Sequence, residues 1–424
     1  MNSAEISNKK SPISEHLPVL LFSLPLCYFM YGIVMKQVPY DLTDYNGHVH
    51  VYLATFTGVS ALEGWKMTPY FLWHLFVLFF NKFFCLQIDI SAAVTSCIFL
   101  LASYFVTVYM LERWSSYNGH TLNSTATAFI SFSLTILQTI WIDHLDAGSS
   151  RLLGTFSINP LFNPTHMAAR PFALLCFMLI IDLWKAMDGK NTVFFPYSKK
   201  KIMIFLSISL ALSAFAKPVF AEMFIPAVGL IMLYRQIVSV RNNKGADYFK
   251  SCLLPAFLVS VPCILVILAE FMAYFLFGGS YGGGEGVVIT GWLEVWSLFS
   301  ENIPLSILLG MSFPILIMIT DAKNFFKTDI GILGTVSYIV GFLQAALLGE
   351  GGDKLSHGDF IWPMLFGMLL LWVSALLHFL NMEKRAASRA ARFVIILGWV
   401  LFLIHLHYGF QYIAEILEWD FLIF

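Results

Sequence analysis

The chain has 424 residues, of which 58% are hydrophobic and only 12% charged, and its mean hydropathy is +0.75. Soluble domains carry about twice that share of charged residues, and a soluble core of this size cannot bury so much apolar surface. The 25 lysines and arginines balance 26 aspartates and glutamates, so there is no basic field to support a nucleic-acid partner. The composition therefore predicts an all-α, polytopic transmembrane helical bundle.

The N-terminus predicts a retained signal anchor. Lys9 and Lys10 precede an apolar run that starts at Leu17, and no small-residue cleavage site follows. Residues 1–16 are therefore expected to form a cytoplasmic tail and residues 17–424 a single polytopic membrane domain. The six cysteines lie in or beside apolar runs without a CxxC motif or a Cys/His cluster, which argues against a disulfide framework and a zinc site.

A membrane-spanning helix needs about 20 largely apolar residues. The candidate segments, in chain order, are 17–35, 67–84, 91–112, 125–142, 171–187, 202–216, 219–234, 251–277, 305–320, 329–348, 359–381 and 393–412. Most lysines and arginines fall in the connections around 185–201, 235–250, 323–327 and 384–392 and before residue 17, which predicts a cytoplasmic N-terminus. The lysine-rich connections all fall on the same side of the membrane only if one of the twelve segments fails to cross. We expect that segment to be 125–142, which is short and carries Gln138, so that about 11 of 12 segments cross.

This topology collects carboxylates, histidines and asparagines in the outer loops 36–66, 143–170, 278–304 and 348–358. In the first loop, Asp44 and His48 are four residues apart and share one helical face. A carboxylate beside an imidazole can accept a proton or bind a divalent cation such as Mg²⁺ or Mn²⁺. The alternative is that Asp44 caps the helix and His48 faces lipid headgroups.

The second loop contains Asn159-Pro160 and Asn163-Pro164, which predict a fixed, non-helical turn before a span. His166 and Arg170 share a helical face behind it, and Arg151 precedes it. These cations suit a phosphate or pyrophosphate group. The alternative is a helix entry capped by Asn163 or Thr165.

The other outer segments add further polar residues. The 278–286 stretch is rich in glycine and predicts a flexible connector rather than a nucleotide site, since it lacks a preceding strand and a P-loop lysine. The fourth loop brings Glu350, His357 and Asp359 to the mouth of a long span, where Asp359 could alternatively cap the helix. Lys217 lies at the tip of a tight hairpin. Ligand binding or catalysis is therefore predicted at the outer surface.

An acidic, histidine-bearing first outer loop after a signal anchor, followed by many spans, resembles the GT-C superfamily of polytopic glycosyltransferases. More narrowly, four segments look like an uncharacterised family of bacterial membrane proteins linked to cell-surface polysaccharide. These segments are Thr68-Pro69-Tyr70-Phe71-Leu72-Trp73-His74-Leu75, Asn159-Pro160 with Asn163-Pro164-Thr165, Lys217-Pro218-Val219-Phe220, and Ser356-His357-Gly358-Asp359-Phe360. The resemblance departs from the GT-C pattern in having no adjacent acidic pair and no large soluble outer domain.

The resemblance implies transfer of a sugar from a polyprenyl-phosphate donor to a glycan, lipid or other envelope acceptor at the outer face of a bacterial cytoplasmic membrane. Asp44 is the best match for the essential carboxylate, Asp41 is second, and His48 would support it. The substrate-binding residues would be Arg151, Asn159, Asn163, His166, Arg170, Lys217, Glu350, His357 and Asp359. The other readings are an O-antigen or capsule-type polymerase or ligase, and a non-catalytic flippase or transporter of lipid-linked glycans.

Overall fold

A computed structural model of the chain describes residues 12–41, 43–58, 65, 68–119, 122–142, 150, 153–273, 286–385 and 388–418. Within these ranges the protein is almost entirely helical, which confirms the expectation of an all-α polytopic protein. The described residues contain one small antiparallel sheet, formed by β1 (Val287–Ile289) and β2 (Leu348–Glu350), in which Val287 pairs with Glu350.

The helices follow one another with short connections. The first half contains α1 (Pro12–Gln37), α2 (Asp44–Leu53), η1 (Ala54–Gly58), α4 (Leu72–Phe83), α5 (Ile88–Tyr117), α6 (Ser124–Ile136), α7 (Pro164–Met187), α8 (Lys199–Ala216) and α9 (Val219–Arg241). The second half contains α10 (Gly245–Tyr248), η2 (Phe249–Leu253), α11 (Leu254–Phe271), α12 (Glu294–Ser297), α13 (Ile303–Thr320), α14 (Ala322–Phe325), α15 (Asp329–Leu347), η4 (Gly352–His357), η5 (Asp359–Ile361), α16 (Trp362–Arg385) and α17 (Arg389–Glu418).

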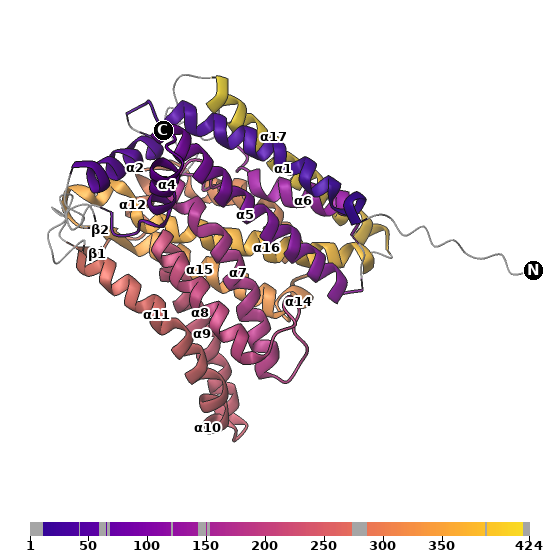
Figure 1. Cartoon of the computed structure of the whole chain (residues 1–424). Coiled ribbons are helices and arrows are strands. Elements are labelled where there is room, and N and C mark those ends of the chain that lie inside the picture. Colours follow the sequence, from indigo (N-terminus) through magenta and orange to yellow (C-terminus); the bar gives the residue numbers. More distant parts are fainter. Residues whose placement is uncertain are drawn as a thin grey trace, which may run out of the picture.

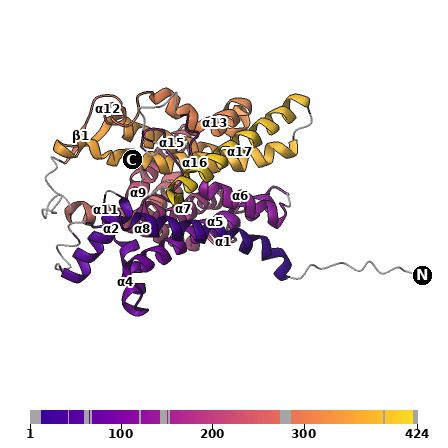
Figure 2. The same ribbon diagram turned by 90° about the horizontal axis from the view of Figure 1, so that it is seen from above.

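Two helices form the centre of the bundle. In the most apolar stretches of α7 and α16, 89% and 94% of the residues are buried, against 22% in α11 and 28% in α9 and α17. Seen from above, α13, α15 and α16 lie on one side and α1, α5, α7 and α8 on the other (Figure 2). The outer helices keep large apolar side chains exposed, among them Leu24, Tyr234, Leu265 and Phe393. That exposure is what lipid contact requires of a membrane bundle.

By length and apolar composition, nine of the described helices can cross a membrane. The apolar helices α4 and α6 are shorter, and α8 spans 18 residues of which the first three are lysines. Each of the twelve apolar segments expected from the sequence overlaps one helix of the structure.

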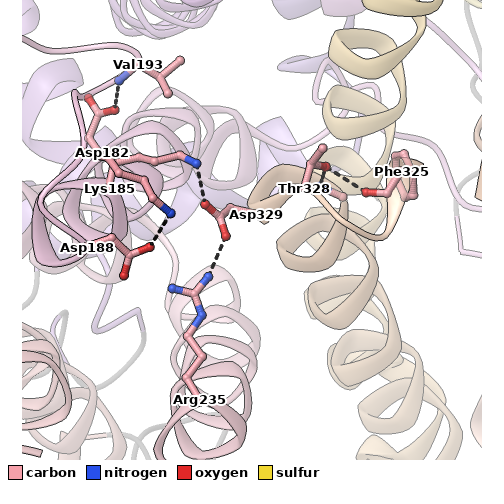
Figure 3. A network of polar contacts seen from close by, with 10 residues as sticks. Asp182, Lys185, Asp188, Val193, Arg235, Phe325, Thr328 and Asp329 are labelled. Atoms are coloured by element: carbon pink, nitrogen blue, oxygen red, sulfur yellow. Dashed lines mark hydrogen bonds and ion pairs between the residues drawn. The ribbon is translucent and has the colours of Figure 1, made fainter. Parts of the chain in front are cut away.

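The lysine-rich connections gather at one end of the bundle, with α10 and α14, whereas α2, α4, α12 and the sheet lie at the other end (Figure 1). At the lysine-rich end, Asp329 accepts from Lys185 at 3.0 Å and from Arg235 at 2.6 Å, and so ties three helices together (Figure 3). Asp182 accepts from the backbone amides of Val193, Phe194 and Phe195 and fixes the connection that follows α7. We call the opposite end, which carries α2, α4, α12 and the sheet, the polar-loop end.

Helix α4 stays at the polar-loop end. Tyr70, just before it, lines the same cavity as Lys217 of the α8–α9 turn. Near its end, Asn81 accepts from the Tyr52 hydroxyl of α2 at 2.7 Å and donates to the Leu86 carbonyl before α5 at 2.9 Å. Its 12 residues rise only about 18 Å. By this placement 67–84 does not reach the lysine-rich end, whereas the sequence led us to expect 125–142 as the segment that fails to cross.

Helix α6 starts at the lysine-rich end and stops at Ile136, part of the way across the bundle. Its start follows residues 118 and 119, whose carbonyls accept from Lys384. Beyond Ile136 the backbone is extended, and Gln138 exchanges two hydrogen bonds with His405 of α17. The next segment reaches α12 at the polar-loop end, where the Trp296 indole donates to the Gly154 carbonyl at 2.9 Å.

The carbonyls at the broken end of α6 are satisfied by residues far along the chain. Arg170 of α7 donates to the Leu134 carbonyl at 2.8 Å, and Asn159 donates to the Ile136 carbonyl at 3.1 Å. A helix end inside a membrane needs such partners because no water is present to bond the last carbonyls. A guanidinium there also faces the negative end of the helix dipole.

Two cations lie at the ends opposite to those expected. Arg113 of α5 donates to the Phe194 carbonyl at 2.9 Å, beside the lysine-rich connection, although the expected crossings of 67–84 and 91–112 place it on the outer side. Lys82 belongs to α4 and therefore lies at the polar-loop end, although a crossing of 67–84 places it on the cytoplasmic side. Both corrections follow from the path of α4, since an uncrossed 67–84 changes the sides of the segments that directly flank α5.

Candidate functional site

Asp44 lies at the start of α2 and contacts two other loops. The N-cap of α2 is Thr43, whose hydroxyl oxygen accepts from the Asn46 amide at 3.1 Å, so Asp44 is not the capping residue. The Asp44 carboxylate accepts from the Asn163 side-chain amide at 3.0 Å. Burial raises the pKa of Asp44, and the Lys217 ammonium and the Asn163 amide partly oppose that rise. The half-buried carboxylate thus accepts from an amide and interacts electrostatically with an ammonium.

Asn163 links the second loop to this carboxylate. Its side-chain oxygen accepts from the His166 backbone amide at 2.8 Å and from the Thr165 hydroxyl at 2.9 Å, which caps α7 as the sequence alternative expected. Pro164 occupies the first turn, where its missing amide proton costs nothing. With its oxygen engaged by the helix, the Asn163 amide is oriented toward Asp44.

Lys217 forms the turn between α8 and α9 and is only 6% exposed. Its ammonium lies 4.1 Å from the centre of the Trp362 ring. Burial lowers the pKa of Lys217, whereas the carboxylates of Asp44, Asp359 and Glu222 raise it. The three carboxylates therefore offset part of the hydration that the ammonium loses on burial.

His48 pairs with a histidine rather than with Asp44. Its Nδ1 lies 3.3 Å from Nε2 of His74 on α4, and both rings pack near Trp73. Burial lowers the pKa of His48, and His74 and Lys217 lower it further. His74 was not among the predicted site residues. Its signal was a histidine at the start of an apolar segment, directly after a Thr-Pro turn.

A cavity of about 220 Å³ opens beside Lys217. Carboxylates and aromatic rings dominate its walls: Tyr70, Lys217, Glu222, Glu270, Phe271, Glu350, Asp359, Phe360 and Trp362. These residues come from the α8–α9 turn, α9, α11, β2, η5 and α16 and from the segment before α4. The Asp44 carboxylate interacts electrostatically with both Lys217 and Asp359, so it belongs to the same group of charges.

Two of the predicted carboxylates meet at this cavity. Glu350 ends β2, and Asp359 begins η5 and is exposed. Burial and the neighbouring Asp359 raise the pKa of Glu350 to about 7, and Lys354 opposes the rise. Asp359 makes no capping hydrogen bond, since the position before η5 is Gly358 in a left-handed conformation. Both carboxylates were expected in the site, and the structure adds that they interact with each other at the wall of this cavity.

Glu222 and Glu270 were not predicted as site residues. Both stand within apolar helices, and Glu270 of α11 is 5% exposed with no hydrogen-bond partner on either oxygen in the described part of the chain. The signal in the sequence was a carboxylate inside an apolar segment, which in membrane helices points to function. A single carboxylate of this kind can also extend its side chain to the membrane surface. The sequence alone therefore did not distinguish a functional residue from one in contact with the membrane surface.

Several predicted residues lie away from the cavity walls. Asn159 and Arg170 bond the end of α6, and Arg170 also donates to the Ile158 carbonyl at 2.7 Å. His166 is buried against Trp362 and Phe366, and within the described ranges neither ring nitrogen has a hydrogen-bond partner. Asp41 is exposed. Arg151 and the His357 side chain lie outside the described residues.

The metal prediction named Asp44 and His48. Within the described ranges, no three histidine, cysteine, aspartate or glutamate side chains are grouped in a way that could hold a metal ion. His48 faces His74, and no contact joins it to the Asp44 carboxylate in the described structure. A divalent cation therefore remains a prediction from the sequence.

Comparison of the chain with protein-family models, curated proteins and solved structures found no match in any of the three.

Proposed function

We propose that this protein is a membrane glycosyltransferase that moves a sugar from a polyprenyl-phosphate donor to an acceptor hydroxyl of a glycan, a lipid or another envelope component. The reaction would take place at the polar-loop end, at the outer face of a bacterial cytoplasmic membrane. The observation that carries the proposal is the half-buried Asp44 carboxylate, which accepts from Asn163 and interacts electrostatically with Lys217 beside a cavity lined with polar and aromatic residues.

Asp44 suits the role of general base. The acceptor hydroxyl oxygen forms a bond to the anomeric carbon, the bond from that carbon to the donor phosphate oxygen breaks, and Asp44 takes the hydroxyl proton. A base works best when its pKa approaches the working pH, and burial moves the pKa of Asp44 in that direction. The Asn163 amide holds the carboxylate in place, because its oxygen is already engaged by the start of α7.

Lys217 suits the role of the group that faces the departing phosphate. Its ammonium is the one cation among the described residues that line the cavity. A fixed positive charge stabilises the charge that develops on a leaving phosphate. Arg170, which the sequence suggested for this role, is instead engaged with two backbone carbonyls.

The test is transfer by purified protein in lipid nanodiscs, supplied with polyprenyl-phosphate carrying a radiolabelled sugar and a membrane extract as acceptor. Asp44→Asn should abolish incorporation and leave the protein monodisperse. Asp89→Asn is the matched control, because Asp89 opens α5 at the same end but does not line the cavity. Full incorporation by the Asp44→Asn protein refutes the assignment.

One observation favours a second candidate, a flippase for lipid-linked glycans. Glu222 and Glu270 stand on apolar helices α9 and α11 and face one cavity, and ionisable groups inside membrane helices commonly mark a transport path. Unimpaired movement of a fluorescent lipid-linked glycan across liposomes by Asp44→Asn protein would support it. The polymerase alternative, which depends on outer-loop arginines, has less support because Arg113 lies at the lysine-rich end.

A further inference from the structure

Acidic side chains outnumber basic ones in the described lining of the cavity beside Lys217. Glu222, Glu270, Glu350 and Asp359 line it, against the single described cation Lys217. Lys354 lies nearby and interacts with Glu350. Such a lining favours a ligand that brings positive charge, and it leaves the Lys217 ammonium as the position for an anionic group.

Lys217 does not neutralise the deepest carboxyl group. Its ammonium lies on the Trp362 ring and is shared among Asp44, Asp359 and Glu222. Glu270 is not among the carboxylates with which it interacts. Among the described residues, neither oxygen of Glu270 has a hydrogen-bond donor, although only 5% of the residue is exposed.

A buried carboxylate without a partner is costly, and acidic residues are rarely so buried unless they are paired. A primary ammonium group supplies the missing positive charge together with three hydrogen-bond donors. Tyr70, Phe360 and Trp362 add aromatic surfaces that can cover a ring or interact with a cation. The cavity, at about 220 Å³, has room for about seven water molecules and so for one small ring.

We propose that this cavity binds a ligand carrying a protonated amine, with the amine at Glu270 and Glu222. Resting on the proposed function, the ligand is an amino sugar, either as the transferred sugar or as the acceptor residue. Its phosphate, if it is the donor, lies toward Lys217, and its amine points toward α11. Sugars with an acidic substituent are excluded by the same carboxylates.

The test measures binding by isothermal titration calorimetry in nanodiscs, at constant ionic strength and at about pH 6, where a sugar amine is protonated. The probes are D-glucosamine and D-glucose, which differ only in the amine and hydroxyl at one carbon. Wild-type protein should bind glucosamine about tenfold more tightly than glucose. Glu270→Gln should reduce that ratio to about two or less, and Glu222→Gln should reduce it in part.

Glu383→Gln is the matched control, since Glu383 lines a separate pocket with Trp114 and Lys384 at the lysine-rich end. It should keep the wild-type ratio. Equal binding of the two sugars, no binding of glucosamine up to tens of millimolar, or an unchanged ratio in both Glu270→Gln and Glu222→Gln overturns the inference. Monodispersity on size exclusion checks each variant, and the use of two glutamates keeps the test decisive if one variant does not fold.

Failure of this inference and failure of the proposed function are distinguishable. Asp44→Asn protein should keep the preference for glucosamine while losing sugar transfer. Selective glucosamine binding without any transfer by wild-type protein would support the amine site and refute the transferase function. Transfer that depends on Asp44, together with equal binding of glucosamine and glucose, would support the transferase function and refute the amine site.

Discussion

Replacement of Arg170 by methionine separates a structural role from phosphate binding. In the structure, one terminal nitrogen of Arg170 donates to the Ile158 carbonyl at 2.7 Å and the other to the Leu134 carbonyl at 2.8 Å. The residue is 2% exposed, so water does not replace these bonds. Arg170→Met keeps much of the side-chain volume, removes both donors and leaves two buried carbonyls unsatisfied.

The magnitude follows from the two carbonyls. Each buried acceptor left without a donor costs about 1–3 kcal/mol. Removal of a buried guanidinium also recovers part of its desolvation cost, which reduces the total. We therefore expect the free energy of unfolding to fall by about 3 kcal/mol. For a chain of this length, that loss lowers the unfolding midpoint by on the order of 5 °C.

The assay is intrinsic tryptophan fluorescence during heating in one detergent at one heating rate, because unfolding of such proteins is rarely reversible. Arg113→Met is the matched control: Arg113 makes one hydrogen bond to a carbonyl, at 2.9 Å, and is less deeply buried. It should lower the midpoint by about a third as much. An Arg170→Met protein with an unchanged midpoint but no lipid-phosphate binding would refute the structural role and restore the phosphate role.

Three further predictions concern other parts of the bundle. Gly409→Ala should lower the unfolding midpoint by several degrees, because its Cβ would lie 2.1 Å from the Ile136 carbonyl oxygen, whereas Gly229→Ala, with nothing within 4 Å, should leave it unchanged or slightly raised; equal midpoints would contradict this. Asp329→Asn should lower the midpoint by loosening three helices at once, and a neutral result at low salt would show that its ion pairs contribute nothing. The pKa of Glu350 is raised from 4.5 to about 7, so the folded state holds this proton longer than the unfolded state and loses stability as pH rises between those values. Glu350→Gln should therefore raise the midpoint at pH above about 7 and leave it unchanged below about 4.5; a gain that does not depend on pH would contradict the cause.

The apolar segments could be predicted because a span is a local property: about 20 apolar residues in a row suffice. The path of the chain between these segments was harder to predict from the sequence. Nothing at Leu137 or Gln138 marks a break, since neither proline nor glycine is present, and α6 ends there because Asn159, Arg170 and His405 supply partners from elsewhere. The sequence showed these three residues as polar but not what they bond.

The candidate site divides in the same way. Asp44, Asn163 and Lys217 were each predicted from their loops, and the structure brings them together because α2, the start of α7 and the α8–α9 turn pack at one end. Glu270 was not predicted as a site residue, because what marks it is that neither carboxyl oxygen has a hydrogen-bond partner among the described residues. Such an absence is a property of the packed bundle and not of neighbouring residues.

The broken α6 also constrains how the chain enters the membrane. A helix of 13 residues is too short to be held stably across a bilayer by itself, and its extended continuation exposes backbone groups that lipid cannot satisfy. The partner of Gln138 is His405, which is synthesised 267 residues later. During biosynthesis, the 124–142 segment therefore has to wait, sheltered by the insertion machinery or at the membrane surface, until α17 arrives. The first half of the bundle is therefore completed only when the last helix is in place. Truncation of α17 is expected to prevent the 124–142 segment from crossing.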